Sequence, residues 1–348
     1  MARELHKLKF TIFALCIHKS LNLKKYCKKI FTLKNFDEQK ILTILNLIDP
    51  KNNKKILIGS GFAEEITKKN IIANRQNLGN DYETISKIKS GLFFKELEKN
   101  NITHPKSTRS RPESSDWLVK SFTSAGGTKI KKIDESKKKL KHDEYYQKLL
   151  KNGELLSVQF FCKNNTAFIQ CICEQLMSKR TKNPFLIESL ITKNVTSDFF
   201  KKLKNLVNRV SYIFKLNGLN NIDLVLYKKK IYLIEINPRP GLSMNIISQL
   251  SKDFTNYENS KLKKISKELY FSTTILYASK KILINKDNFK FIKELDSTKN
   301  FSELPNIYDK IMPDEPICLL HLKSKQRDLL GEKIEKMSYK VLSHLEKY

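Results

Sequence analysis

The sequence lacks the residue patterns that mark several classes of protein. Its six cysteines form no C-x-x-C pair and its six histidines show no H-E-x-x-H spacing, so we predict neither a zinc site nor a disulfide framework. No apolar run approaches the ~20 residues of a membrane span. Only nine prolines interrupt 348 residues, and 40% of the chain is hydrophobic, which argues against disorder. The chain can therefore bury a sizeable core, and its length predicts two or three lobes.

Arginine is scarce, although the chain carries a formal net charge of +30. Lysine supplies most of that charge and is spread along the whole sequence, and aromatic residues are not interleaved with the basic runs. We therefore expect no specific nucleic-acid partner. The basic, then apolar start could pass for a signal peptide, but His18 and Lys19 follow at once and no A-x-A-like site is present. We interpret Phe10–Cys16 as a core strand and expect a cytoplasmic protein with no membrane partner.

Strand and helix patterns alternate in residues 10–75, which predicts an α/β fold with a parallel sheet in an N-terminal lobe. Predicted strands are Phe10–Cys16, Lys55–Ile58, Trp117–Lys120, Leu155–Phe161, Ala167–Cys173, Ser272–Tyr277 and 316–322. Predicted helices are Lys19–Lys29, Asp37–Leu47, 84–103, 198–216 and 326–346, with a loop and then a helix in 131–148 and a basic helix from 250 onward.

The most informative segment is DLVLYKKKIYLIEINPRPG, residues 223–241. It predicts a hairpin, and a turn centred on Lys229 places Asp223 opposite Glu235. Asn237 shares the face of Glu235, because strand side chains alternate with period two. Two carboxylates facing each other repel, whereas a bound cation removes that penalty. The hard-oxygen set of Asp223, Glu235 and Asn237 therefore predicts a Mg²⁺ (or Mn²⁺) site that carries phosphates.

Two further features suit phosphate chemistry. Lys120 ends a predicted strand and precedes a loop of small residues, whose backbone N–H groups can approach phosphate oxygens. The loop residues that we select are Ser124, Gly126 and Gly127. Taken alone, a tight turn after an edge strand explains this loop equally well. Arg239 lies between two prolines that restrict the backbone, and its guanidinium can hold a phosphoryl group in a bidentate grip.

These motifs resemble the ATP-grasp superfamily, which includes biotin carboxylase, D-alanine–D-alanine ligase and carbamoyl-phosphate synthetase. The resemblance covers most of the chain and is most specific in residues 84–245. It implies that Lys120 binds the phosphates of ATP, and that residues 146–154 form the adenine hinge. Within that hinge it implies roles for Gln147, for the backbone of Lys148 and Leu149, and for Glu154 on the ribose. A plain helix C-terminus that stops at Gly153 is the alternative reading of this segment.

The finer pattern resembles a group of ATP-dependent carboligases, with tyramine–glutamate ligase as a distant cousin. Its marks include GSGF at 59–62, WLVK at 117–120 and NPRPGLS at 237–243. D-alanine–D-alanine ligases carry an arginine two residues before the first metal acid, whereas this chain carries Asn221. The first ATP lysine of the superfamily is left open between Lys87 and Lys89.

The resemblance implies an ATP-grasp fold, with an N-terminal lobe in residues 1–83 that helps to bind the second substrate. The ATP-grasp core then spans 84–250, including a small lobe at about 106–155, and residues 251–348 complete the large lobe. We predict a ligase that joins a small carboxylate to an amine or a related nucleophile through an acyl phosphate and releases ADP and phosphate. A phosphotransferase is the first alternative and a basic nucleic-acid-binding protein the second. A homodimer is a candidate assembly.

Overall fold

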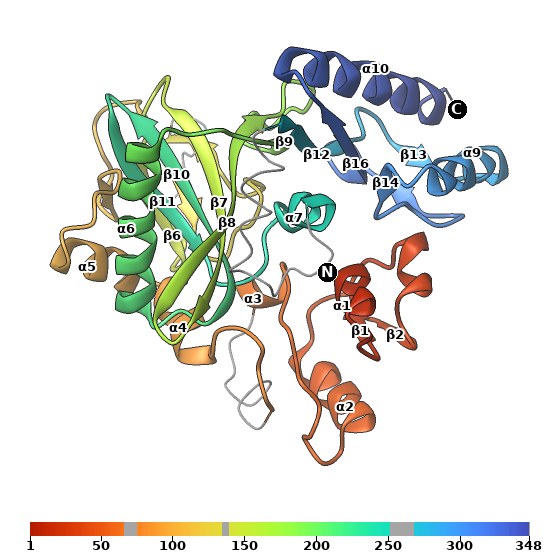
Figure 1. Ribbon diagram of the computed structural model, residues 1–348, viewed down its shortest axis with the longest axis horizontal. Helices are drawn as coiled ribbons and strands as arrows, with labels where there is room; N and C mark the ends of the chain where they lie inside the picture. Colours follow the sequence, from red (N-terminus) through yellow and green to blue (C-terminus); the bar gives the residue numbers. More distant parts are fainter. Residues whose placement is uncertain (66–74, 134–138, 251–267, 348) are drawn as a thin grey trace. The chain divides into compact units, whose positions relative to one another are not determined.

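The protein is described by a computed structural model that covers residues 1–65, 75–133, 139–250 and 268–347. Two compact units make up the chain (Figure 1). The hairpin unit comprises Glu38–Glu174 and Val195–Gly241, and the terminal unit comprises Met1–Asp37, Gln175–Asn194 and Leu242–Tyr348. No helix in the described ranges is both long and apolar enough to cross a membrane.

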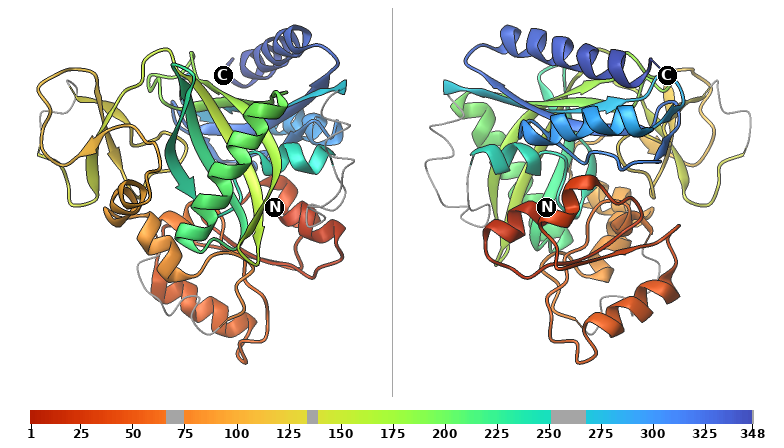
Figure 2. Two further views of the ribbon diagram at one scale, coloured as in Figure 1. Left: turned by 60° about the vertical axis from the view of Figure 1, so that its left-hand side comes forward. Right: turned by 90° about the vertical axis from the view of Figure 1, so that its right-hand side faces the viewer.

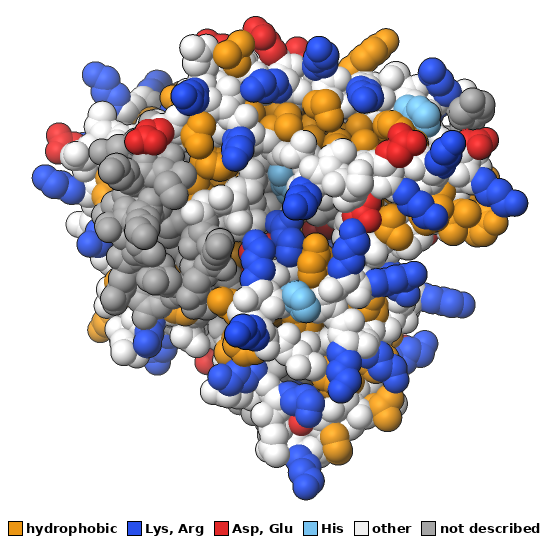
Figure 3. All heavy atoms as spheres, turned by 45° about the vertical axis from the view of Figure 1, so that its right-hand side comes forward, with side chains coloured by type: hydrophobic (Ala, Val, Ile, Leu, Met, Phe, Trp, Pro, Cys, Tyr) orange, Lys and Arg blue, Asp and Glu red, His pale blue; other side chains and the backbone are white. Residues whose placement is uncertain are grey.

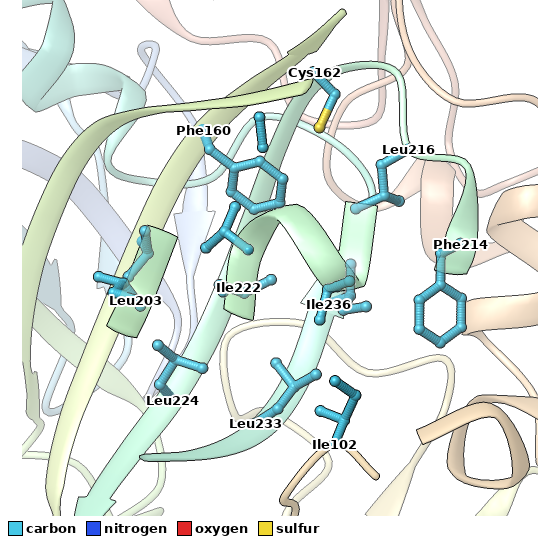
Figure 4. Close-up of a cluster of buried hydrophobic side chains, with 14 of the residues drawn as sticks. Ile102, Phe160, Cys162, Leu203, Phe214, Leu216, Ile222, Leu224, Leu233 and Ile236 are labelled. Carbon is cyan, nitrogen blue, oxygen red and sulfur yellow. The ribbon is translucent and has the colours of Figure 1, made fainter. Parts of the chain in front are cut away.

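The hairpin unit is built on antiparallel strands in the order β11-β10-β7-β8. Their bounds are β7 Glu154–Lys163, β8 Thr166–Met177, β10 Gly218–Tyr227 and β11 Lys230–Asn237. Helix α6, Ser197–Phe214, packs along one face (Figure 1). Its Leu203 joins Phe160 and Leu224 of the strands in a fully buried cluster (Figure 4). This apolar face leaves the opposite face of the same strands for polar side chains.

A smaller antiparallel sheet lies in the same unit, in the order β3-β6-β4-β5. Its strands are β3 Ser107–Thr108, β4 Trp117–Ser121, β5 Lys131–Lys132 and β6 Glu144–Lys148. Trp117, Val119, Ile133 and Tyr146 form its core. The polar face of this sheet carries Lys120 and Gln147. Lys120 pairs with Tyr145 of β6, and Gln147 shares the face of Tyr145 because it lies two residues further along that strand.

Helices of the hairpin unit precede these sheets in the chain. They are α2 Glu38–Ile48, α3 Phe62–Glu65, α4 Tyr82–Ile88 and α5 Leu92–Lys99. The helix predicted over 84–103 is therefore two helices, separated at Ser90–Gly91. Glycine weakens a helix interior and the Ser90 hydroxyl accepts from the Leu92 N–H, which together favour a new start at this point. The strand predicted at Lys55–Ile58 is reduced to one parallel bridge between Ile56 and Asn77.

The terminal unit confirms the predicted N-terminal parallel sheet, because β1 (Phe13–Cys16) pairs in parallel with β2 (Lys29–Thr32). Its main sheet has the strand order β9-β12-β16-β14. Their bounds are β9 Ile187–Thr192, β12 Tyr270–Tyr277, β14 Phe301–Ser302 and β16 Pro316–Ser324. Helix α10, Arg327–Leu345, lies along this sheet (Figure 2). Its Leu330 and Ile334 pack against Ile191 of β9. The remaining elements are α1 Ala2–Lys7, η1 Leu21–Lys25, α7 Met244–Leu250, β13 Ile282–Leu283, α9 Lys286–Ser297 and β15 Lys310–Ile311.

Two predicted helices are wrong. Lys19–Lys29 contains only the short 3-10 helix Leu21–Lys25, because β2 begins at Lys29, with Ile30 and Phe31 favouring a strand. Residues 131–132 and 144–148 form β5 and β6 where a loop and then a helix were predicted, since Tyr145 and Tyr146 pair with β4, and residues 134–138 lie outside the described ones. The basic helix predicted from 250 onward falls largely on 251–267, outside the described residues.

Candidate active site

The register of the β10–β11 hairpin places Asp223 opposite Glu235, which confirms that predicted pairing. The turn itself is shorter than predicted, because Tyr227 pairs with Lys230 and the turn residues Lys228 and Lys229 both have positive φ, 48° and 63°. A β-bulge between Asp223 and Leu224 supplies the missing residue on β11. The two acids therefore face each other because a two-residue turn is combined with a bulge.

The predicted metal-binding side chains converge at this bulge. The Asn237 Nδ2 donates to Asp223 Oδ2 and to Glu235 Oε1, each at 3.1 Å. Asp223 also accepts from Asn221 Nδ2 at 3.1 Å, and Ser157 Oγ donates to Asn221 Oδ1 at 3.0 Å. Asp223 and Asn237 are both buried. Neighbouring amides thus hold both carboxylates in place on the polar face of the sheet.

Burial and nearby charges separate the two carboxylates. Burial, and then the charge of Glu235, raise the pKa of Asp223 well above its usual range. Burial also acts to raise the pKa of Glu235, but Lys120 and Lys89 outweigh it and lower that pKa. The pair therefore favours one proton on Asp223 when no cation is bound. A divalent cation can replace this proton and satisfy both carboxylates.

Lys120 lies beside the acid pair. Its Nζ is 4.0 Å from Glu235 Oε2 and donates to Gln147 Oε1 at 3.2 Å. Burial lowers the pKa of Lys120, while Glu235 and Asp223 act to raise it. The side chain is thus a buried cation held at the edge of the carboxylate site, as a phosphate ligand requires.

The structure distinguishes the two lysines that the sequence left open. Lys89 is nearly buried, its Nζ lies 3.9 Å from Glu64 Oε1, and its charge acts on both Glu235 and Lys120. Lys87 instead pairs with Glu96 at 3.1 Å and lies over the Phe214 ring. Lys89 is therefore the lysine that joins the site.

The loop after β4 is a tight turn of small residues. Gly126 and Gly127 have φ of 61° and 83°, which is a left-handed conformation that glycine adopts at little cost. The Ser124 hydroxyl accepts from the Lys129 N–H at 3.3 Å, and Thr123 Oγ1 donates to Asp143 at 3.0 Å. These contacts fix the two ends of the loop and leave the glycines at its tip.

The segment that follows β6 runs through a turn into β7, so the reading of Gly153 as a helix stop is wrong. Gln147 uses Oε1 to hold Lys120, and a carbonyl oxygen can accept a second bond. The N–H groups of Lys148 and Leu149 donate to the Lys106 and Asp116 carbonyls, at 2.8 and 2.9 Å. Any purine contact of these two residues would therefore use groups other than their N–H groups. Glu154 begins β7.

Arg239 brings in a residue that sequence analysis did not select. Its Nε and Nη2 both donate to Glu64 Oε1, at 2.8 and 2.7 Å, and Nη2 also donates to Asn237 Oδ1 at 3.3 Å. Glu64 is 5% exposed. The sequence signal that could have found Glu64 is its position three residues after Gly61 at a helix start, where a glutamate caps the helix.

The site residues therefore fall into two sets. A connected polar network joins eight side chains, namely Glu64, Lys89, Lys120, Gln147, Asp223, Glu235, Asn237 and Arg239. The other predicted residues lie in two neighbouring segments of the chain, the loop after β4 and the turn from β6 into β7. They are Ser124, Gly126, Gly127, Lys148, Leu149 and Glu154.

The donor set at the bulge fits a hard cation. Asp223 and Glu235 offer carboxylate oxygens, and Asn237 offers an amide oxygen once its side-chain amide is rotated by half a turn. In the part of the chain that the structure describes, no three His, Cys, Asp or Glu residues are grouped to hold a metal. A cation here would therefore need further oxygen ligands, as Mg²⁺ has when it carries phosphates.

Comparison with known proteins agrees with this geometry. A family model described as "ATP-grasp domain" matches residues 89–243. A search of curated proteins found no match to the sequence. Among solved structures, the biotin carboxylase domain of Hydrogenobacter thermophilus 2-oxoglutarate carboxylase, bound to MgADP and bicarbonate, gives a TM-score of 0.69 at 11% identity. The match covers 96% of this chain and 85% of that chain.

Two enzymes with other substrates are similar. N5-carboxyaminoimidazole ribonucleotide synthetase from Thermotoga maritima gives a TM-score of 0.65 at 15% identity, covering 97% of this chain and 93% of that chain. L-amino acid ligase from Bacillus licheniformis gives a TM-score of 0.67 at 11% identity, and the match covers 95% of this chain and 97% of that chain. Identities this low establish the fold alone. Residues 89–243 therefore match an ATP-grasp domain model, and the chain has the fold of these solved enzymes.

Proposed function

We propose that the protein is an ATP-dependent ligase that joins a small carboxylate to an amine through an acyl phosphate. The observation that carries the proposal is the pair of facing carboxylates, Asp223 and Glu235, with Asn237 beside them and a buried Lys120 4.0 Å from Glu235. This set suits a metal-bound triphosphate. The solved relatives support the reaction class, because one holds MgADP with bicarbonate and another is a ligase of amino acids.

Two steps make up the proposed reaction. A substrate carboxylate oxygen attacks the γ-phosphorus of ATP, the bond to the bridging oxygen breaks, and ADP leaves. The amine nitrogen then attacks the acyl carbon, inorganic phosphate leaves, and the nitrogen loses a proton. Mg²⁺ held by Asp223, Glu235 and Asn237 would neutralise charge on the phosphates. The enzyme's contribution is positioning and electrostatics, so no nucleophilic side chain is required.

The other residues of the site have proposed roles in these steps. Lys120 and Lys89 bind the phosphates of ATP, and the glycine loop covers them. Arg239 stabilises the group in transfer, and residues 147–154 hold the adenosine. We propose the boundaries 1–83, 84–250 and 251–348 for the lobes, with the turn at Gly59–Gly61 on the side of the second substrate.

A screen of ADP release tests this function. Purified protein with MgATP is supplied with pools of small carboxylates, amino acids and polyamines, and ADP is measured. We expect ADP release to require both a carboxylate and an amine. Release with a single phosphate acceptor and no amine would identify a phosphotransferase. Glu235→Gln should largely abolish this ADP release. Glu98→Gln is its control, because Glu98 is an exposed acid of the same unit.

A further inference from the structure

Glu64 is a buried acid with a defined place beside Arg239. It is the third residue of α3, and its Oε2 accepts the N–H of Gly61 at 2.7 Å. This is the glutamate half of a capping box, which fixes the carboxylate against its own helix start. The other oxygen, Oε1, accepts both Nε and Nη2 of Arg239. One carboxylate therefore links the Gly59–Gly61 turn to the exit of the hairpin.

This contact determines how the Arg239 guanidinium is oriented. Arginine has five N–H donors in a rigid plane. Nε and Nη2 are directed at Glu64, Nη2 also reaches Asn237, and Nη1 donates to the Pro240 carbonyl at 3.1 Å. These contacts use four of the five donors and leave one on Nη1. The plane and direction of the guanidinium are thus set before any substrate arrives.

Charge adds a second effect. Lys89 Nζ lies 3.9 Å from the same Oε1 that holds Arg239, so the two cations approach one carboxylate oxygen. Removing the negative charge of Glu64 would leave Lys89 and Arg239 close together and repelling each other. The neighbouring Glu65 is exposed and offers a matched comparison on the same short helix.

We propose that Glu64 is a positioning residue that aims Arg239 at the phosphoryl group in transfer. The proposal rests on the proposed ligase function. It predicts that Glu64 acts chiefly through Arg239, so that its loss affects the phosphoryl group in transfer more than the binding of MgADP.

The test uses thermal unfolding with two probes, MgADP alone and MgADP with aluminium fluoride, which imitates a phosphoryl group in transfer. The wild-type chain should gain stability with MgADP and gain more with aluminium fluoride. Glu64→Gln should keep most of the MgADP shift and lose most of the second increment, as Arg239→Ala should, and Glu65→Gln should keep both. The double variant, Glu64→Gln with Arg239→Ala, should lose no more of the aluminium fluoride increment than either single variant.

The outcomes separate the two proposals. If MgADP does not stabilise the wild-type chain, the proposed function fails. If MgADP does but Glu64→Gln keeps the full aluminium fluoride increment, or if the double variant loses clearly more, the positioning role is wrong. Should Glu64→Gln not fold, Glu64→Asp replaces it, because aspartate keeps the charge but shortens the reach to Arg239. A reduced aluminium fluoride increment in Glu64→Asp supports the proposal, and an unchanged increment contradicts it.

Discussion

At the scale of single residues, the candidate site places three basic side chains beside three acids, one of which, Asp223, favours its protonated form while no cation is bound. Lys89, Lys120 and Arg239 face Glu64, Asp223 and Glu235 within one polar network. Burial makes each of these charges costly unless it is paired. This pairing explains how so many ionisable groups lie in the hairpin unit, and why loss of any one of them should disturb its neighbours.

The two lysines before α5 give a matched prediction. Lys89→Ala should weaken MgATP binding about ten-fold, or ~1.4 kcal/mol, because it removes a nearly buried cation from the proposed phosphate site. Lys87→Ala should leave binding unchanged, since Lys87 pairs with Glu96. Titration calorimetry of both variants measures the difference. Equal losses in the two variants would contradict the assignment of Lys89.

A buried histidine in the terminal unit predicts a pH effect on stability. His321 lies between Ser302 Oγ at 2.7 Å and Thr273 Oγ1 at 3.2 Å, and burial, helped by Arg3, lowers its pKa to about 4. The unfolded chain, with a histidine pKa near ~6.5, takes up this proton first as the pH falls. The free energy of unfolding should therefore decrease between pH ~6.5 and about 4, by roughly 3 kcal/mol from this residue.

Denaturant unfolding of the wild-type chain and His321→Gln at pH 7 and pH 4.5 tests this effect. Glutamine keeps one donor and one acceptor but does not titrate in this range. The variant should lose less stability than the wild-type chain on acidification. Identical losses would show that His321 does not contribute to the acid sensitivity.

At the scale of elements, the start of β10 is held by a close backbone approach. Gly218 has φ of 65°, and a Cβ at this position would lie 2.3 Å from the Leu78 carbonyl oxygen. Asn80 fixes the same segment, because its Nδ2 donates to Asn220 Oδ1 and to the Pro238 carbonyl. The chain that precedes α4 is thus tied to both ends of the β10–β11 hairpin.

Gly218→Ala should lower the free energy of unfolding by more than ~2 kcal/mol, because it combines a backbone clash with an unfavourable φ. Gly91→Ala is the matched control, since Gly91 has φ of −60° and an added Cβ would meet nothing within 4 Å. That variant should be neutral or slightly stabilising. Urea unfolding of both proteins compares them, and a neutral Gly218→Ala would show that this approach is not tight.

Sequence patterns predicted the hairpin well, because alternation fixed both arms and the acids marked one face. The predicted turn is centred on Lys229, whereas the observed turn consists of Lys228 and Lys229. The difference arises from the bulge next to Asp223, which has no signature in the composition. Residues 144–148 form a strand although the lysines before them favour helix, because pairing with β4 imposes strand. Glu64 was missed because its partner Arg239 is 175 residues away, a contact that only the fold brings about.

At the scale of the whole molecule, the positive charge is dispersed. Lysine and arginine side chains are scattered among other residue types over the face shown in Figure 3. A net charge of +30 should attract any polyanion weakly, and salt should screen that attraction. We predict no sequence-selective binding to a panel of DNA and RNA oligomers at ~150 mM salt, measured by fluorescence anisotropy. Sub-micromolar binding that distinguishes sequences would support a nucleic-acid function instead.

The central claim is that the hairpin acids hold a metal that carries ATP. Thermal and denaturant unfolding with ATP, with Mg²⁺ and with both tests it most directly, in wild-type, Glu235→Gln and Glu98→Gln proteins. With ligand at ~100 times its Kd, we predict ~2.7 kcal/mol of added stability for the wild-type and Glu98→Gln chains only when both are present. We predict little or none for Glu235→Gln. Absence of any shift in the wild-type chain, or a full shift in Glu235→Gln, would contradict the account.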